Sequence, residues 1–311
     1  MRRTILTILT IILATALAVS NLGATASARD IFVNNVRGND ATRGFSAEST
    51  DADNGPLKTI ARALRIAEPS DRIVLIDTGE PYRTSISLSG KNCSGTKNAP
   101  FTIVGNGVTL DGTQPVPDNG WKHYQGDIFR FQPPQVGFQC LYRDGVPVNR
   151  ALVTGTTMPR LDPGQWCLFG PYIYFRVEKD RLPADYHLSY GQLSTGITLL
   201  YVQNVLIQDV AVQGFRLDGI SAINNAYGVR LLRVIARGNG RAGISIGNVS
   251  DVEIKDSLLG ANGSAQILTL PRSKTRVVNT QIIATTAPAF DRQGGQLSTE
   301  GNKIIEEKVS E

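Results

Sequence analysis

A repeat of 23 to 24 residues runs through the second half of the chain and limits the folds that the chain can adopt. Successive copies begin 24, 23 and 23 residues apart, at Asn204, Gly228, Asp251 and Lys274. A Gly-Ile pair recurs in phase at Gly196, Gly219 and Gly243, and Gln266-Ile267 takes its place in the fourth copy. A constant period of this size indicates one structural unit that is stacked several times.

Each copy contains three short stretches in which apolar and polar residues alternate, as in Val252-Glu253-Ile254-Lys255. This alternation is typical of strands that turn one side chain inward and the next outward. The stretches are too short for the helices of ankyrin or tetratricopeptide repeats. One copy cannot bury its inward face alone, whereas stacked copies bury a continuous core. We therefore predict an all-β solenoid rather than an ordinary β-sandwich.

The copies resemble coils of the right-handed parallel β-helix, the fold of the pectate-lyase-like superfamily. The resemblance extends upstream through Phe32-Val33-Asn34-Asn35, through Gly55-Pro56-Leu57-Lys58-Thr59-Ile60 and through Leu110-Asp111-Gly112, and covers residues 30–283. It implies an exported bacterial protein with this fold. It does not select an activity, because lyases, glycosidases, epimerases and non-catalytic adhesins share the fold.

Two segments depart from the repeat. Leu57, Ile60, Ala61 and Leu64 have the spacing of an amphipathic helix, ended by Pro69, which we predict to cap the stack. Residues 113–194 contain both tryptophans and predict a β-rich insertion, which resembles the inserted subdomain of glycosidase-like β-helix families. Its aromatic residues suit either a sugar-binding platform or the insertion's own core.

The predicted organisation is a signal peptide followed by one domain. Arg2 and Arg3, an apolar run and the small residues Ala26-Ser27-Ala28 form a secretory signal pattern over residues 1–28, with an uncleaved anchor as the alternative. The domain, 29–311, divides into a cap (29–70), first coils (71–112), the insertion (113–194), regular coils (195–283) and a C-terminal tail or cap (284–311). This pattern predicts a periplasmic, cell-surface or extracellular protein without a membrane span after signal removal.

The net charge argues against nucleic acid as a partner, and the cysteine count limits the possible disulfide bonds. Loss of Arg2 and Arg3 lowers the formal net charge from +5 to +3, which is too small to argue for binding to nucleic acid. Cys93, Cys140 and Cys167 are odd in number, so at least one thiol is free, and Cys140 with Cys167 is a candidate bridge.

The family resemblance places the substrate groove on the strand that begins at the Gly-Ile pair. By alternation, Thr198, Ser221 and Ser245 point outward and line up. The predicted substrate-binding residues are Ser221, Asn224, Asn225, Asn239, Ser245 and Asn248, and the predicted catalytic residues are Asp218, Arg216 and Arg241. The alternatives are a turn-closing role for Asp218, a structural ladder role for Asn239 and solvated arginines.

The residues of this groove are compatible with two classes of reaction, β-elimination by a lyase and hydrolysis by a glycosidase. A lyase needs a base and a neutralised substrate carboxylate, roles for Arg216 or Arg241, but a single acid such as Asp218 makes a poor Ca²⁺ site. A hydrolase needs two carboxylates, and the Asp218-Gly219 pair resembles only part of the polygalacturonase motif. We interpret Asp51 and Asp53 as solvated charges rather than a Ca²⁺ loop, and no metal site is predicted.

Two functions follow, with an inactive, truncated relative as a third. The first is an exported polysaccharide lyase or glycosidase. The second is a non-catalytic β-helix protein that binds a polysaccharide or a cell-surface glycan. A second carboxylate near Asp218 would favour hydrolysis over simple binding.

Overall fold

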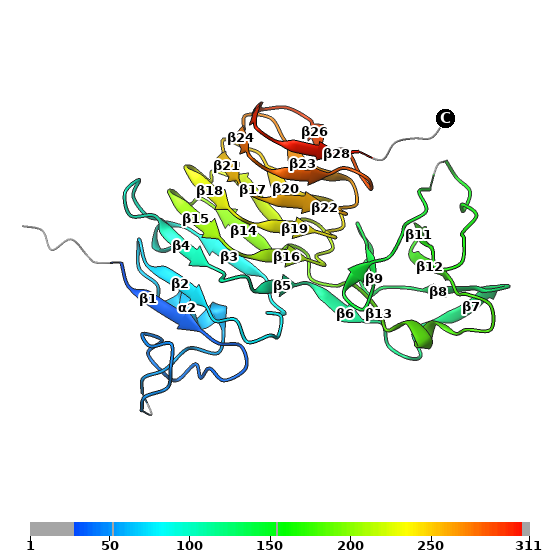
Figure 1. Ribbon diagram of the computed structural model, residues 1–311, viewed down its shortest axis with the longest axis horizontal. Coiled ribbons are helices and arrows are strands. Elements are labelled where there is room, and N and C mark those ends of the chain that lie inside the picture. The colour runs from blue at the N-terminus through cyan, green and yellow to red at the C-terminus, as the bar shows by residue number, and fades with distance from the viewer. Residues whose placement is uncertain (1–27, 52, 154, 307–311) are drawn as a thin grey trace, which may run out of the picture.

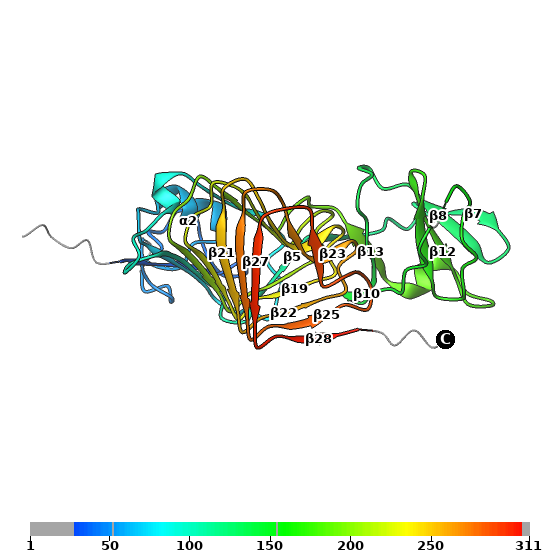
Figure 2. The ribbon, with the colours of Figure 1, turned by 90° about the horizontal axis from the view of Figure 1, so that it is seen from above.

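The computed structural model describes residues 28–51, 53–153 and 155–306. These residues form a stack of parallel coils, and a β-rich lobe projects from one side of the stack (Figures 1 and 2). The predicted signal peptide, apart from Ala28, lies outside the described residues. Within the described part of the chain, no helix is long and apolar enough to cross a membrane.

Three parallel sheets build about five turns of the solenoid. Sheet 1 contains β1 (Asp30–Val33), β2 (Arg72–Leu75), β4 (Phe101–Val104), β15 (Val205–Gln208), β18 (Val229–Leu232), β21 (Asp251–Lys255), β24 (Lys274–Val278) and β27 (Gln296–Glu300). Sheet 2 contains β5 (Thr109–Asp111), β16 (Ala211–Gln213), β19 (Ile235–Arg237), β22 (Leu258–Gly260), β25 (Gln281–Ile283) and β28 (Lys303–Ile305). Sheet 3 contains β3 (Ile86–Ser89), β14 (Ile197–Leu200), β17 (Ile220–Asn224), β20 (Ala242–Ile246), β23 (Ala265–Thr269) and β26 (Phe290–Arg292).

The register of the strands reproduces the sequence repeat. Ile220 pairs with Ile244, and Ile244 pairs with Ile267, so residues 23 or 24 positions apart lie one above another. These isoleucines are fully buried in one core that runs the length of the stack. Each buried isoleucine contributes about 1.5–3 kcal/mol, and only the neighbouring coils provide that burial. The predicted parallel solenoid is therefore confirmed, while its right-handed sense stays a prediction.

One short helix, α2 (Ile60–Ile66), is the only α-helix among the described residues and lies beside β1 and β2 (Figure 1). Thr59 begins it by accepting a hydrogen bond from the Arg62 amide. The predicted helix is present but shorter than its spacing indicates, because Leu57 is held in a bridge to Val33 before the helix starts. Ala63, and not Ala61, faces the core. A capping role for α2 stays a prediction.

The inserted residues form two antiparallel sheets. Sheet 4 has the order β10 (Val146–Pro147), β9 (Leu141–Arg143), β13 (Leu188–Gly191) and β6 (Thr113–Pro115). Sheet 5 has the order β11 (Trp166–Phe169), β12 (Tyr172–Arg176), β8 (Ile128–Phe131) and β7 (Lys122–Gln125). Two 3₁₀ helices, η1 (Lys91–Cys93) and η2 (Pro183–Tyr186), lie before and within the insertion. Asp144 and Gly145, both with positive φ, make a tight turn between β9 and β10.

The two ends of the insertion are held together by one backbone carbonyl group, that of Gly112. The Gly112 oxygen accepts hydrogen bonds from the amides of Gln192 and Leu193, each at 3.0 Å. Most of the lobe's large aromatic residues form its own core, in which Trp166 and Tyr142 are fully buried. That arrangement favours the core interpretation for these two residues over the sugar platform.

The stack continues beyond the point where the repeat fades in the sequence. Strands β26, β27 and β28 add one more coil, with Phe290 above Ile267 and Ile304 above Ile282. The regular coils were expected to end at residue 283 and to be followed by a C-terminal tail or cap over residues 284–311. Within that segment, residues 303–305 form a strand of sheet 2. Among the described residues, this coil packs against the preceding coil alone, and Ile304 is exposed.

The three cysteines are free and buried. Cys140 lies in the core with Trp166, whereas Cys167 points to a separate small cluster with Leu161 and Tyr174. Burial raises the pKa of both thiols to about 11, so both are protonated at neutral pH. The candidate Cys140–Cys167 bridge is not formed in this structure.

A ladder of buried amides supports the turns between sheets 2 and 3. The Asn262 Oδ1 accepts from the amide nitrogen of Asn239 at 2.9 Å and from its Nδ2 at 3.0 Å. The Asn262 Nδ2 donates to the Ala236 carbonyl at 3.0 Å and to the Gln266 Oε1 at 2.7 Å. Asn239 continues the ladder to the amide of Phe215 in the previous coil. Each side chain therefore satisfies backbone groups that the turns leave unpaired.

Replacing Asn262 with alanine should lower the free energy of unfolding by about 2–3 kcal/mol, because it leaves buried donors and acceptors without partners. Equilibrium unfolding in urea measures this loss. Asn98→Ala is the matched control and should change stability little, because Asn98 is exposed and its side chain forms no hydrogen bond within the described part of the chain. An equal effect of the two substitutions would contradict a supporting role for the ladder.

Candidate functional site

The predicted outward row on sheet 3 is present. Thr198 pairs with Ser221, and Ser221 pairs with Ser245, so the alignment expected from the sequence is confirmed. The same row continues into Leu268 and Asp291. Ser221 is 5% exposed and Ser245 is fully buried, so little of this row reaches the solvent.

Asp218 lies in the turn before β17 and is held by an ion pair. Its Oδ1 accepts from the Arg241 Nε at 2.9 Å, and its Oδ2 accepts from the Arg241 Nη2 at 2.5 Å and from the Ser245 hydroxyl at 2.8 Å. The hydrogen bond to Asp218 raises the pKa of the Arg241 guanidinium above its ordinary value. Asp218 is only 1% exposed, so both oxygens are already occupied and shielded.

Arg216 is separate from that ion pair. Its Nη2 donates to the Gln135 Oε1 of the insertion at 2.6 Å. Arg216 and Gln135 line a hollow of about 240 Å³ between the lobe and the coil, together with Tyr190 and Gln192. The three predicted catalytic residues thus divide between two locations.

The predicted asparagines also divide. Asn224, Asn225 and Asn248 lie at the other end of sheet 3, where Asn248 Nδ2 donates to Asn224 Oδ1 at 3.3 Å. Tyr227, which is exposed, lies two residues after Asn225 in the chain. Asn239 belongs to the buried amide ladder and is fully buried, which matches the ladder alternative and leaves it no access to a ligand.

A different cleft, of about 370 Å³, lies between the first coils and the insertion. Asp111 and Arg83 contribute to it from the solenoid, while Asp118 and Trp121 contribute from the segment after β6. The other lining residues are Thr113, Pro115, Val116, Pro117, Gly145, Pro183, Ala184, His187, Leu188 and Ser189. Its volume is within the range of small-ligand sites, and its lining combines apolar walls with a few charged groups.

The two acids of the cleft have different surroundings. Asp111 is buried, accepts from the Thr113 amide at 2.8 Å, and lies 3.5 Å from the Arg83 Nη1. Asp118 is exposed, and its side chain makes no hydrogen bond to another residue that the structure describes. Trp121 is half-buried and packs against Phe131 and Phe175, with ring centroids 5.8 and 6.1 Å away. The cleft can therefore offer carboxylates, a cation and an indole ring to one ligand.

Sequence reasoning did not single out this cleft, although two signals for it were present. Asp111 and Asp118 flank the point where the insertion leaves the solenoid, and Trp121 follows them closely. Arg83 is 28 residues upstream of Asp111, so no single motif contains the set. These residues come together only because the insertion packs against the first coils, and the sequence does not show that contact.

The described residues contain no group of three or more His, Cys, Asp or Glu side chains that could hold a metal ion. The two acids considered for a Ca²⁺ loop are exposed. The Asp51 Oδ1 accepts from the amides of Asp53 and Asn54, at 2.9 and 2.8 Å, and so closes its own turn.

Asp218→Asn should lower the free energy of unfolding by about 3 kcal/mol, because Arg241 then remains half-buried without a countercharge. Asp209→Asn is the matched control, since Asp209 makes the same two-pronged pair with Arg233 on the exposed surface. Its loss should be much smaller. Urea unfolding compares the two variants. Equal losses would show that the enclosure of Asp218 has no energetic consequence.

No protein-family model and no curated protein matches this chain. Among solved structures, one named "Glycoside hydrolase" is 12% identical, with a TM-score of 0.57 over 84% of this chain and 76% of that one. The complex of XylC with xylose is 9% identical, with a TM-score of 0.43 over 87% and 69% of the two chains. Pectate lyase Pel9A is 11% identical, with a TM-score of 0.33 over 94% and 81%. The first likeness shows a shared fold, in agreement with the resemblance found in the sequence.

Proposed function

We propose that this chain is a carbohydrate-active β-helix protein that acts outside the cytoplasm on a polysaccharide or a cell-surface glycan. The cleft between the first coils and the insertion is its binding site in this proposal. The fold and the predicted signal peptide support the class of function. The observation that carries the assignment of the site is the meeting of Trp121 with Asp111, Asp118 and Arg83 in one cleft.

The chemistry of the cleft suits a sugar. A pyranose ring presents apolar C–H faces, which stack on an indole, and hydroxyl groups, which bond to carboxylates and guanidinium groups. Trp121 supplies the first kind of surface, and Asp118 and Arg83 supply the second. The proline residues of the lining keep the walls apolar without adding backbone donors.

The groove on sheet 3 is the weaker site. Asp218, the predicted catalytic acid, already accepts three hydrogen bonds from Arg241 and Ser245. A general acid or nucleophile needs an oxygen that can reach the substrate. Asn224, Asn225 and Asn248 form a polar edge that could contact a glycan, and this edge is the alternative binding location.

A second candidate function, glycoside hydrolysis, is favoured by the presence of two carboxylates in the cleft. Inverting and retaining hydrolysis both use a pair of acids on either side of the glycosidic bond. Asp111 is enclosed and Asp118 is exposed, and such unequal surroundings are a basis for unequal roles.

Trp121→Ala should weaken binding to the recognised glycan at least about 10-fold, because it removes the stacking surface of the cleft. The test is a polysaccharide panel presented to residues 29–311, followed by calorimetric titration of the best ligand. Tyr227→Ala, which removes an exposed aromatic ring on the alternative edge, is the control and should leave affinity unchanged. Loss of binding in Tyr227→Ala alone would move the site to the edge with Asn224 and Asn248.

The same panel tests catalysis. A hydrolase would release reducing ends, and Asp118→Asn and Asp111→Asn would each lower the rate about 100-fold or more. Absorbance from unsaturated uronates would instead indicate a lyase, with Arg216 or Arg241 as the candidate base. The assay is run with and without added Ca²⁺ to test whether a lyase activity depends on the metal. Binding without either product would identify a non-catalytic module.

A further inference from the structure

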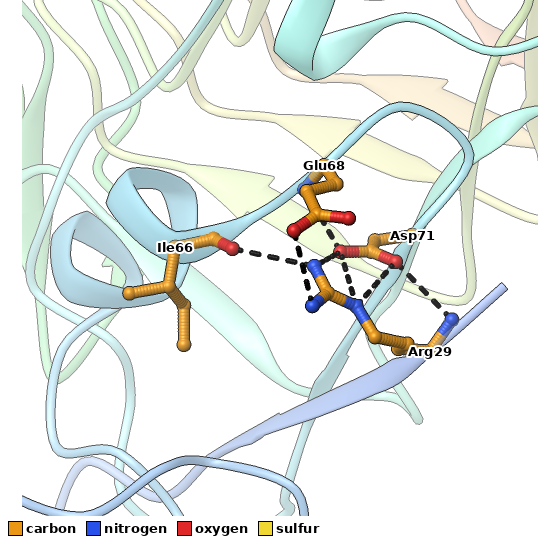
Figure 3. A network of polar contacts seen from close by, with 4 residues as sticks. All are labelled: Arg29, Ile66, Glu68 and Asp71. Carbon is orange, nitrogen blue, oxygen red and sulfur yellow. Dashed lines mark hydrogen bonds and ion pairs between the residues drawn. The ribbon is translucent and has the colours of Figure 1, made fainter. Parts of the chain in front are cut away.

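A buried carboxylate at the start of the domain is surrounded by groups of Arg29 (Figure 3). The Asp71 Oδ2 accepts from the Arg29 Nη2 at 2.6 Å, and its Oδ1 accepts from the Arg29 main-chain nitrogen at 3.2 Å. The Glu68 amide also donates to Asp71, at 2.8 Å, and the Glu68 carboxylate lies 3.3 Å from the Arg29 Nη1. The Asp71 residue is 2% exposed.

The main chain of Arg29 is fixed in this position. Its carbonyl accepts from the Arg72 amide at 2.8 Å, which extends the parallel pairing of β1 with β2 by one residue. Its guanidinium donates to the Ile66 carbonyl at the end of α2, at 3.4 Å. Ala28, the residue before it, is exposed and outside the strand. Among the described residues, the pairing with β2 therefore starts at the residue that follows the predicted cleavage site.

Among the described residues, the charges around Asp71 do not balance while residue 29 is an internal residue. Asp71 and Glu68 carry two negative charges, and the Arg29 guanidinium carries one positive charge. The nearby Asp30 and Arg72 neutralise each other, with 3.2 Å between Oδ1 and Nη1. One further positive charge at the Arg29 main-chain nitrogen would balance the cluster.

We propose that hydrolysis of the Ala28–Arg29 bond by a signal peptidase supplies that charge and that the new amino terminus is a structural part of the mature fold. Water adds across the peptide bond, Ala28 leaves as a carboxylate, and the Arg29 nitrogen becomes an α-ammonium group. The nitrogen that donated one neutral N–H to the Asp71 carboxylate then carries a positive charge itself, so a Coulomb attraction is added to the hydrogen bond. Processing thus strengthens the junction of β1, β2 and α2.

The stabilisation by the new amino terminus depends on pH. Asp71 and Glu68 favour the charged form of the α-ammonium group, and the Arg29 guanidinium opposes it, so we expect its pKa above the ordinary value of about 7.7–8.0. The stabilisation is then present below that ordinary value and is lost as the pH rises through the raised pKa. Burial raises the pKa of Asp71, but hydrogen bonds from Arg29 and Glu68 outweigh it and hold that pKa below its usual value. The effect therefore also fades in acid, as Asp71 is protonated.

The test compares two chains that differ by one exposed alanine, residues 29–311 and residues 28–311, each released from a fusion partner without added residues. In the longer chain the Arg29 nitrogen is again an amide. The melting temperature of the 29–311 chain should be higher by about 2–4 °C at pH 6–7, and the difference should shrink above pH 9. Equal melting temperatures across this range would overturn the proposal.

Asp71→Asn in both chains tests whether the carboxylate is the partner. The difference in melting temperature should disappear in this pair, whereas a difference that persists would contradict the proposal. If Asp71→Asn does not fold, Glu68→Gln, at an exposed position, replaces it and should reduce the difference. Amino-terminal sequencing of the chain exported from a bacterial host should give Arg29 as the first residue, and a start at any other residue would exclude this role.

Discussion

Stacking of one coil on the next is the interaction on which the rest of this structure depends. A single coil exposes its inward isoleucine and valine side chains and the unpaired edges of its strands, so it has no stable fold alone. The next coil covers both at once, as the pairing of Ile220, Ile244 and Ile267 shows. This register sets the position of each outward-facing side chain on the three parallel sheets.

The register also pairs the polar residues. Asp218 with Arg241, Asn239 with Asn262, and Glu253 with Arg276 are each 23 residues apart, which is the length of one coil. Such pairs lie one above the other and satisfy each other, so a polar row on a solenoid is first a set of contacts between coils. An outward side chain is available to a ligand only where its neighbours in the row leave it unpaired.

This principle explains what the sequence could and could not predict. The period and the alternation were enough for the solenoid, its continuous buried core and the alignment of Ser221 with Ser245, and the family resemblance supplied the parallel arrangement of its strands. The same period placed Arg241 one coil after Asp218, and it therefore contained the evidence for their ion pair. The extra coil of β26, β27 and β28 was missed because a terminal coil needs few apolar residues. The helix start was misplaced because Leu57 is held by Val33 rather than by helical bonding.

The cleft between the lobe and the first coils could not be predicted from the repeat. Its residues come from both sides of Gly112, where the repeat is interrupted, and no fixed spacing relates Arg83 to Asp118 or Trp121. The contact of lobe and coil is close: a side chain at Gly240 would clash with the Phe138 carbonyl. Because the coils pair their own polar residues, an exposed carboxylate such as Asp118 and a half-buried indole such as Trp121 are expected where a non-repeating segment meets the stack. The place where the repeat fails is therefore where a ligand-binding function is best sought.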